Sequence, residues 1–488
     1  MTASTRRRRY AASVATLSLA GLTLLSGCGS HLSQAALQRA NGALKTGAQG
    51  TDLAAGQAGD QLGAGQSVDA SGQAGGGPTG GAGPGAAASS GAATATGGGA
   101  NAVSGGSGGA GVVSGPGQAK GEIVFGSLGT AAGVLGAVSG PAPPAIRAWV
   151  SAENAKGGLA GHPVRVIQAD DGGDPARAQS IVQQFVEQDH VVAIFYDYMF
   201  SEKPSVLSYL ESKNVPLIGT QGGDPSGDHS PIDFNPLTGP SNGIDWSFIL
   251  GVHTFKPSVT KLASFYCREA ATCSIEEQGF KQFLPWNGIH LVYETQVSLA
   301  QPDFTAEVIQ ARSAGAEAIL CLIDSNSVIR VAQAAQRQGW NVQLAGTYNL
   351  EQDIILPGAK DLEGLILTTR EAPYQSSPKL QMYRDAMARY QPGQAVGDLG
   401  AGVFVVGAML DKIGPQLPNK PTSADFVNAL YSLHGEKLNG LLPGITFNKG
   451  THQNVNQCIV PIILHNGVFV AHDGAESFVC APTWQPGT

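Results

Sequence analysis

From about residue 121 onward, short apolar runs alternate with longer stretches whose apolar residues recur every three or four positions. The short runs predict strands and the longer stretches predict helices. The predicted strands cover 123–125, 163–169, 191–195, 215–218, 262–266, 289–294, 318–323 and 342–345. This alternation is typical of a parallel sheet with crossover helices, so an α/β fold is expected. Two consecutive blocks of similar length, 121–247 and 248–372, predict two Rossmann-like lobes.

Local residues indicate where several helices begin and end. Asp174-Pro175 predicts a helix start, because aspartate accepts from free amides and proline suits the first turn. Lys156-Gly157-Gly158 predicts a helix end, because glycine readily adopts the left-handed cap. A further helix is expected over 399–413, and Asn466-Gly467 predicts a hairpin turn late in the chain.

The N-terminus has the pattern of an export signal rather than of a folded segment. Four arginines, Arg6–Arg9, precede the apolar run Tyr10–Leu25, which is too short and too rich in Ala and Ser to span a bilayer comfortably. The ending Leu25-Ser26-Gly27-Cys28 resembles a bacterial lipobox, which implies that residues 1–27 are removed. It also implies that lipidated Cys28 anchors the chain to the outer face of the cell membrane. An ordinary secretory signal with an incidental cysteine is the alternative, and the arginine pairs leave twin-arginine export open.

Residues 28–120 predict a flexible tether. The stretch from His31 to Lys120 contains no aromatic residue or isoleucine, but 26 glycines among its 90 residues. Such a segment buries too little apolar surface to offset the entropy of ordering it. As a Gly-rich coil it would span about 50 to 55 Å, enough to hold a domain away from a membrane.

Charge and cysteine content limit the possible functions. Removing residues 1–27 removes four of the 29 basic residues and none of the 37 acidic ones, leaving a formal charge of −12. With no basic cluster left, the chain is not expected to bind nucleic acid. Five cysteines remain in the folded part, and export makes disulfides plausible. The economical pairs are Cys267 with Cys273 and Cys458 with Cys480, which leaves Cys321 as a buried thiol in an apolar strand.

Ligand-binding residues are expected at the carboxyl ends of the predicted strands, where loops and helix N-termini meet. The first such loop, Gly126–Gly133, is rich in glycine, and Tyr196–Phe200 adds aromatic side chains that could line a pocket or pack between lobes. Strand ends in the second block carry Arg268, Asp324-Ser325-Asn326 and Gly346–Asn349. Arg268 is either a partner for a ligand carboxylate or a solvated loop residue.

Recognisable catalytic and cofactor motifs do not occur in the folded part. There is no Gly-Lys-Ser/Thr P-loop, no G-x-G-x-x-G, no G-x-S-x-G elbow and no C-x-x-C pair. Asp170-Asp171-Gly-Gly-Asp174 could be a calcium loop, but a strand end followed by a helix cap fits better because the closing glutamate is missing. We therefore predict that the chain is not an enzyme and uses no metal or cofactor.

Several motifs together resemble the substrate-binding proteins of branched-chain amino-acid ABC transporters, the type I periplasmic binding proteins. The matching motifs are Trp149-x4-Asn154-x2-Gly-Gly-Leu-x-Gly161, Asp170-Asp171, Asp174-Pro175, Asn214–Ile218, Asp303-Phe304, Ala332-Gln333 to Gln338-Gly339 and Gly444–Gly450. The resemblance implies two lobes that are joined by a three-crossover hinge and close on a small ligand. It assigns 121–247 with 373–444 to lobe 1 and 248–372 with 445–488 to lobe 2.

The resemblance also implies a set of ligand-binding residues. They are Ser127, Leu128, Gly129, Leu135, Tyr198, Met199, Phe200, Gln221, Gly222, Arg268, Asp324, Ser325 and Tyr348. Amino-acid binders often carry Gly-x-Glu where this chain has Gly346-Thr347-Tyr348, so the usual carboxylate for a ligand amine is missing, although Glu269 or Glu351 could replace it. An aromatic, amide-like or larger apolar solute therefore fits better than a plain aliphatic amino acid.

These features predict a monomeric, lipid-anchored solute-binding protein that passes a small organic ligand to the membrane subunits of an ABC permease. A ligand-sensing receptor domain would share the same fold. A cleft enzyme or a wall-interaction protein is the alternative from a different class.

Overall fold

The computed structural model describes residues 101–103, 120–200, 202–220, 225–237, 242–350, 353–449, 458–472 and 477–480. The predicted signal peptide, Cys28 and most of the predicted tether lie outside the described residues, as do Gln221, Gly222 and Glu351.

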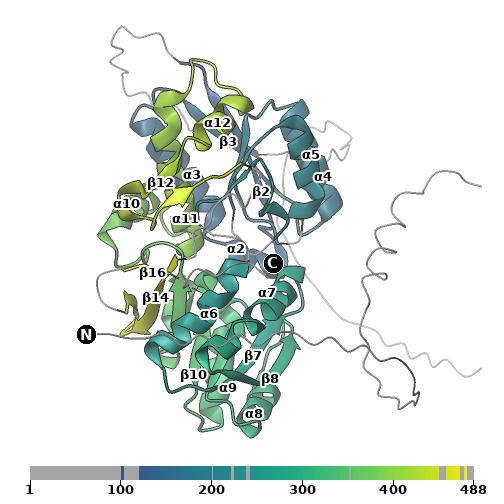
Figure 1. The fold of residues 1–488 in the computed structure, drawn as a ribbon, viewed down its shortest axis with the longest axis vertical. Coiled ribbons are helices and arrows are strands. Elements are labelled where there is room, and N and C mark those ends of the chain that lie inside the picture. Colours follow the sequence, from purple (N-terminus) through teal and green to yellow (C-terminus); the bar gives the residue numbers. More distant parts are fainter. Residues whose placement is uncertain are drawn as a thin grey trace, which may run out of the picture. The chain divides into compact units, whose positions relative to one another are not determined.

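The first sheet is built from strands that the amino-terminal βαβ block supplies (Figure 1). Its order is β1-β3-β2-β4-β5-β6, and every pairing is parallel except β1 with β3. The strands are β1 Asn101–Val103, β2 Ile123–Gly129, β3 Val164–Asp170, β4 Ala193–Asp197, β5 Leu217–Thr220 and β6 Asp233–Phe234. The helices of this block are α2 Gly133–Ser139, α3 Ala142–Ala155, α4 Pro175–Glu187 and α5 Lys203–Lys213.

Alternating side chains of the first sheet pack into two separate cores. Ile123 and Phe125 of β2 join the core formed with α3 and with the later helices α11 (Asp398–Ile413) and α12 (Ser423–Leu430). Val124 packs in the opposite core, under α4 and α5. Figure 1 shows these two groups of helices on either side of β2. The Asp174 side chain accepts from the amides of Ala176 and Arg177, which confirms the predicted start of α4.

The second sheet has the order β15-β14-β11-β10-β9-β7-β8, with β16 also pairing with β14. The central strands are parallel, whereas β14 runs antiparallel to both β11 and β15. The strands are β7 Lys261–Cys267, β8 His290–Val297, β9 Ala318–Leu322, β10 Gln343–Gly346, β11 Ile366–Thr369, β14 Cys458–His465, β15 Val468–Ala471 and β16 Val479–Cys480. Its helices are α6 Asn242–Phe255, α7 Ala271–Lys281, α8 Thr305–Ser313 and α9 Ser325–Arg337.

The chain passes between the two sheets three times. It leaves the first sheet after β6, and it leaves the second after β11 to form α10 (Gln381–Tyr390) and α11, which pack on α3. It returns to the second sheet as β14, after the two-stranded sheet of β12 (His434–Glu436) and β13 (Ile445–Thr446). Short 3-10 helices occupy Pro225–Gly227, Leu284–Asn287, Tyr348–Leu350, Asp353–Asp361, Pro378–Leu380, Gly414–Gln416 and Leu438–Gly440. The expected α/β fold with two parallel-sheet lobes is confirmed.

Two local expectations differ from the structure. The loop predicted at Gly126–Gly133 begins only after Gly129, because β2 stays paired with β3 along its whole length. Gly126 lies against the ring of Phe185, so a glycine here serves close packing within a strand rather than a turn. In addition, the segment predicted as tether contains β1, whose backbone pairs with the edge of β3.

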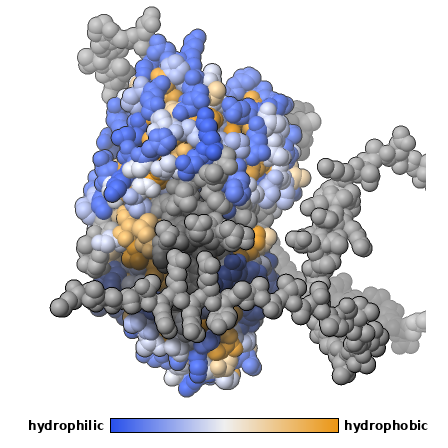
Figure 2. All heavy atoms as spheres, viewed as in Figure 1, coloured by the Kyte–Doolittle hydropathy of each residue, from blue (hydrophilic) through white to orange (hydrophobic). Residues whose placement is uncertain are grey.

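Both predicted disulfides are present, Cys267–Cys273 and Cys458–Cys480, and Cys321 is a buried free thiol as expected. The second bridge joins β14 to β16. The face seen in Figure 2 is mostly hydrophilic around α12 and α5, with hydrophobic residues scattered. In the described part of the chain, no helix has both the length and the apolar character needed to cross a bilayer.

Candidate functional site

A pocket lies where residues that follow β2 and β4 of the first sheet meet the strand ends of the second. Its cavity volume is about 40 Å³, room for roughly three or four water molecules at ~10–15 Å³ each. The lining residues are Leu135, Val138, Phe200, Cys267, Ala270, Thr272, Cys273, Glu276, Leu299, Leu322, Ile323, Asp324, Thr347, Tyr348 and Asn349. The site therefore has mainly apolar walls with a few polar groups, as small-molecule sites usually do.

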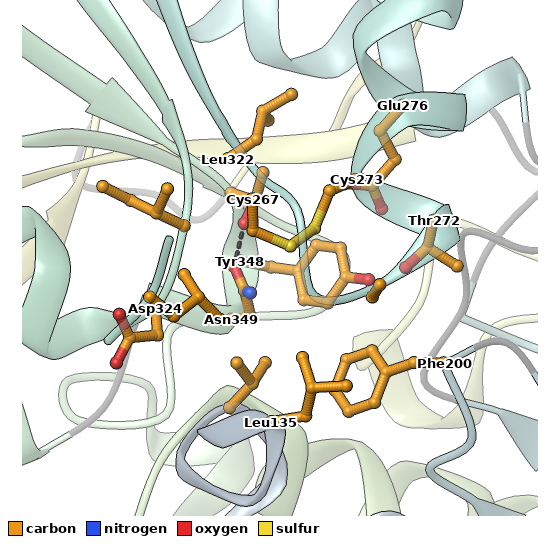
Figure 3. A pocket seen from close by; sticks show the side chains of 15 residues that line it. Leu135, Phe200, Cys267, Thr272, Cys273, Glu276, Leu322, Asp324, Tyr348 and Asn349 are labelled. Atoms are coloured by element: carbon orange, nitrogen blue, oxygen red, sulfur yellow. Dashed lines mark hydrogen bonds between the residues drawn. A yellow bond between two sulfur atoms is a disulfide. The ribbon is translucent and has the colours of Figure 1, made fainter. Parts of the chain in front are cut away.

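The first-lobe side of the pocket is apolar. Leu135 and Val138 come from α2, and Phe200 follows the end of β4. Figure 3 shows Leu135 and Phe200 on the opposite side of the Tyr348 ring from the Cys267–Cys273 disulfide. Both side chains also pack against the core of the second lobe, so they bridge the two lobes at this point.

The opposite wall is formed by the disulfide and the first turns of α7. The bridge ties the last residue of β7, Cys267, to Cys273 near the start of the helix. Thr272 and Glu276 are four residues apart on α7, so they lie on the same face of the helix and both reach the pocket. The polar atoms of this wall are thus the Thr272 hydroxyl and the Glu276 carboxylate.

Tyr348 forms the floor of the pocket and connects it to a buried charge cluster. The guanidinium carbon of Arg370 lies 3.9 Å from the centroid of the Tyr348 ring, a cation–π contact. Arg370 Nη2 in turn lies 3.2 Å from Asp398 Oδ2, and Thr369 Oγ1 donates to Asp398 Oδ1 at 2.5 Å. The neighbouring Glu371 is fully buried, and burial together with the nearby Asp398 raises its pKa well above the ordinary value.

The two carboxylates that line the pocket have different surroundings. Asp324 is the N-cap of α9, where its Oδ1 accepts from the amide of Ser327 at 3.0 Å. Glu276 is half-buried, and burial raises its pKa to about 7. Such a shift means that the protein around Glu276 does not compensate its negative charge.

The residues predicted from the sequence separate into four groups. Leu135, Phe200, Asp324 and Tyr348 line the pocket. Ser127, Leu128, Gly129, Tyr198, Met199 and Ser325 are buried and do not line it. Arg268 is exposed and donates weakly to the Gln296 carbonyl at 3.5 Å. Gln221 and Gly222 lie outside the described residues.

The first-lobe members of the buried group include residues of β2 and of the segment after β4 that contact one another. Gly129 bridges to Tyr198, whose ring occupies the place where a Cβ on residue 129 would be. Ser127 Oγ donates to the Tyr196 carbonyl at 3.1 Å. The loops after β2 and β4 therefore meet as expected, but their contact is internal and only the more distant Leu135 and Phe200 reach the cavity.

Sequence reasoning missed Thr272 and Glu276, which the structure places in the pocket. It also assigned Cys267 and Cys273 only a structural bond, whereas both line the cavity. A signal was available, because a disulfide closing a short loop at a strand end keeps the following helix beside that strand end. Positions one helical turn apart near the start of α7 then face the site.

The two-lobed α/β fold with a pocket at the meeting strand ends defines a class of solute-binding proteins. The family model described as periplasmic binding protein matches residues 122–461, so the chain belongs to the periplasmic binding protein family. As a member of this family, the chain is an extracytoplasmic binding protein and not an enzyme, as predicted from the sequence. A search of curated protein sequences finds no match.

Many solved structures share this fold. A fatty acid ABC transporter substrate-binding protein from Thermomonospora curvata is 20% identical, with 72% of this chain and 91% of that chain covered and a TM-score of 0.60. A branched-chain amino acid ABC transporter from Thermus thermophilus with bound valine is 15% identical, covering 72% and 95%, with a TM-score of 0.61. An extracellular ligand-binding receptor from Rhodopseudomonas palustris HaA2 is 15% identical, covering 71% and 99%, with a TM-score of 0.60.

Proposed function

We propose that the protein is a lipid-anchored extracytoplasmic solute-binding protein that delivers a small organic ligand to an ABC permease. The observation that carries this proposal is the small, mainly apolar pocket formed by Leu135 and Phe200 on one side and by Tyr348 and the Cys267–Cys273 bridge on the other. A ligand that contacts both sides at once favours the closed arrangement of the lobes, and lobe closure is how such receptors report occupancy. The similar folds of a fatty acid ABC transporter substrate-binding protein and a branched-chain amino acid ABC transporter support the delivery step.

The anchor and the tether are part of the same proposal. Lipidated Cys28 would hold the receptor at the membrane, and the Gly-rich segment 28–120 would let the folded part reach its permease. The proposed lobes are 121–247 with 373–444 and 248–372 with 445–488. The first boundary falls within α6 and the last between β12 and β13, so each lies a few residues from the crossover itself. A single acyl chain binds membranes only marginally, so the lipoprotein would need more than one chain for stable retention.

Ligand binding is tested on the purified mature chain by thermal shift against amino acids, amines, amides, aromatic acids and sugars. A compound that binds only the folded state raises the melting temperature. Uptake of the radiolabelled hit should then fall in cells that lack this protein and return when it is restored. Absence of a shift across the whole panel, or chemical turnover of a hit, would contradict the proposal.

Anchoring is tested with Cys28→Ser, expressed beside the unchanged chain. We expect the unchanged protein in the membrane fraction and labelled by radioactive palmitate, and the variant unlabelled. Equal release of both proteins into the medium would identify an ordinary secretory signal instead.

A further inference from the structure

The pocket has an uncompensated negative charge. Its described lining includes two acidic side chains, Glu276 and Asp324, and no lysine, arginine or histidine. The parts of 121–488 that the structure does not describe contain one histidine, His452, but no lysine or arginine. A ligand carboxylate would therefore meet Glu276 without a basic side chain to offset the repulsion.

Two arginines close to the pocket in sequence or contact are already engaged elsewhere. Arg370 lies behind the Tyr348 ring and is paired with Asp398. Arg268, which follows β7, is exposed and directed to the Gln296 carbonyl. Neither side chain lines the cavity.

Glu276 differs from the carboxylates around it. Asp324 accepts the amide of Ser327, Glu269 accepts from Ser298 and Leu299, and Glu277 is bonded to Ser264. Among the described residues, no donor bonds Glu276 and no cation pairs with it. Because a half-buried carboxylate without a partner is unfavourable, Glu276 is the group in this pocket that gains most from a cationic donor.

We propose that the pocket selects a small primary amine, whose ammonium binds Glu276 and whose compact apolar body packs between Leu135, Phe200 and Tyr348. This rests on the proposed solute-binding function and names the ligand class. Thr272, one turn earlier on α7, supplies a hydroxyl next to Glu276 that can accept a second ammonium hydrogen. In Figure 3 both α7 side chains lie on the same side of the Tyr348 ring. The small cavity, about 40 Å³, favours a short branched or cyclic body over a long chain.

The test compares molecules that share one apolar body and differ in charge. Calorimetry at pH 8 on the mature chain uses 3-methylbutylamine, 3-methylbutan-1-ol, 3-methylbutanoate and leucine. We expect the amine to bind at least tenfold more tightly than the alcohol, and the acid to give no binding heat. Leucine should bind more weakly than the amine, because its carboxylate lacks a basic partner in the pocket.

Variants locate the interaction. Glu276→Gln should weaken amine binding at least tenfold and leave alcohol binding unchanged, whereas Glu187→Gln, an equal charge change at an exposed site of the first lobe, should alter neither. Melting temperatures check that both variants fold, and Glu276→Asp keeps the charge if Glu276→Gln does not fold. Binding of the acid or alcohol as tightly as the amine, or unchanged amine affinity in Glu276→Gln, would overturn this inference but leave solute binding intact. No binding by these four probes or by the broader thermal-shift panel would instead overturn the proposed function.

Discussion

Arg370 stacks on Tyr348 at 3.9 Å and pairs with Asp398 at 3.2 Å, so one side chain joins the floor of the pocket to the start of α11. Arg370 follows the last parallel strand of the second sheet, whereas α11 packs on α3 of the first lobe. The contact therefore sits at a crossover between lobes. A ligand that shifts the Tyr348 ring would also shift Arg370, which is one member of the buried ion pair with Asp398.

Replacing Arg370 should destabilise the protein strongly. Arg370→Gln leaves Asp398 buried without its cation, and breaking a buried pair in this way costs about 3–5 kcal/mol. Denaturant unfolding would measure the loss. The control is Arg268→Gln, which changes the same charge at an exposed position and should stay within about 0.5 kcal/mol of the parent. Similar effects of the two substitutions would contradict the importance of the pair.

Asp197 should make the protein less stable as the pH rises from 4 to 8. Burial raises its pKa to about 7 from an ordinary 3.8, so folding favours the protonated form. The stability that protonated Asp197 contributes to folding is fully present below about pH 4 and is lost as the pH rises through 7. The loss is on the order of 4 kcal/mol at most. Asp197→Asn should retain the Thr220 hydrogen bond and be more stable than the parent at pH 8 but not at pH 4.

Urea unfolding at the two pH values tests this expectation, and the difference between variant and parent isolates Asp197 from other buried acids. Exposed Asp385 provides the matched Asp→Asn control, which should not change the pH dependence. If the parent instead became more stable relative to Asp197→Asn as the pH rose, the predicted direction of the pH dependence would be wrong.

The two disulfides should differ in their effect on ligand binding. Opening Cys458–Cys480, with a sequence separation of 22, should cost about 3–4 kcal/mol, and opening Cys267–Cys273, with a separation of 6, about 2–3 kcal/mol. Of the two bridges, only Cys267–Cys273 lines the pocket. Paired Cys→Ser variants should therefore both melt at lower temperatures, but only the variant at 267 and 273 should bind ligand more weakly. Equal affinity in the two variants would argue against a role for the bridge in shaping the site.

Amine binding should strengthen as the pH rises through about 7. The Glu276 carboxylate, whose pKa burial raises to about 7, must be ionised to attract an ammonium, so affinity should fall up to tenfold for each pH unit below that value. The other charged or ionisable side chains at the pocket are Asp324, Tyr348 and, behind the ring, Arg370. Calorimetry with 3-methylbutylamine from pH 5.5 to 8.5 measures the profile. The amine affinity of Glu276→Gln should not change with pH. An affinity of the parent that does not change with pH would contradict the assignment of Glu276 as the ammonium-binding group.

Much of the fold could be predicted because local patterns were consistent with the final topology. Asp174-Pro175 starts α4, and the apolar run around Cys321 became the buried strand β9. Parallel strands place their carboxyl ends along one edge, so Phe200, Asp324 and Tyr348 could be predicted near the site. Gly126 could not be assigned correctly, because its need for a small side chain arises from Phe185, a distant residue.

Glu276 could not be predicted for a related reason. It lies inside a helix rather than at a strand end, and its position in the pocket depends on how α7 packs beside β7. The neighbouring Glu277, one position along, faces Ser264 and Lys281 instead. A rotation of α7 by one residue would exchange their roles, and sequence periodicity does not fix a helix orientation this finely.

The place of β14 has a consequence for biosynthesis. This strand inserts between β11 and β15, and its Pro461 lies opposite Thr368. While the chain is being made and exported, β11 presents an open strand edge until residues beyond 458 have emerged, and open edges invite pairing with other chains. Completion of the second lobe must therefore wait for a late segment, and β11 stays open to pairing with other chains until β14 has joined it.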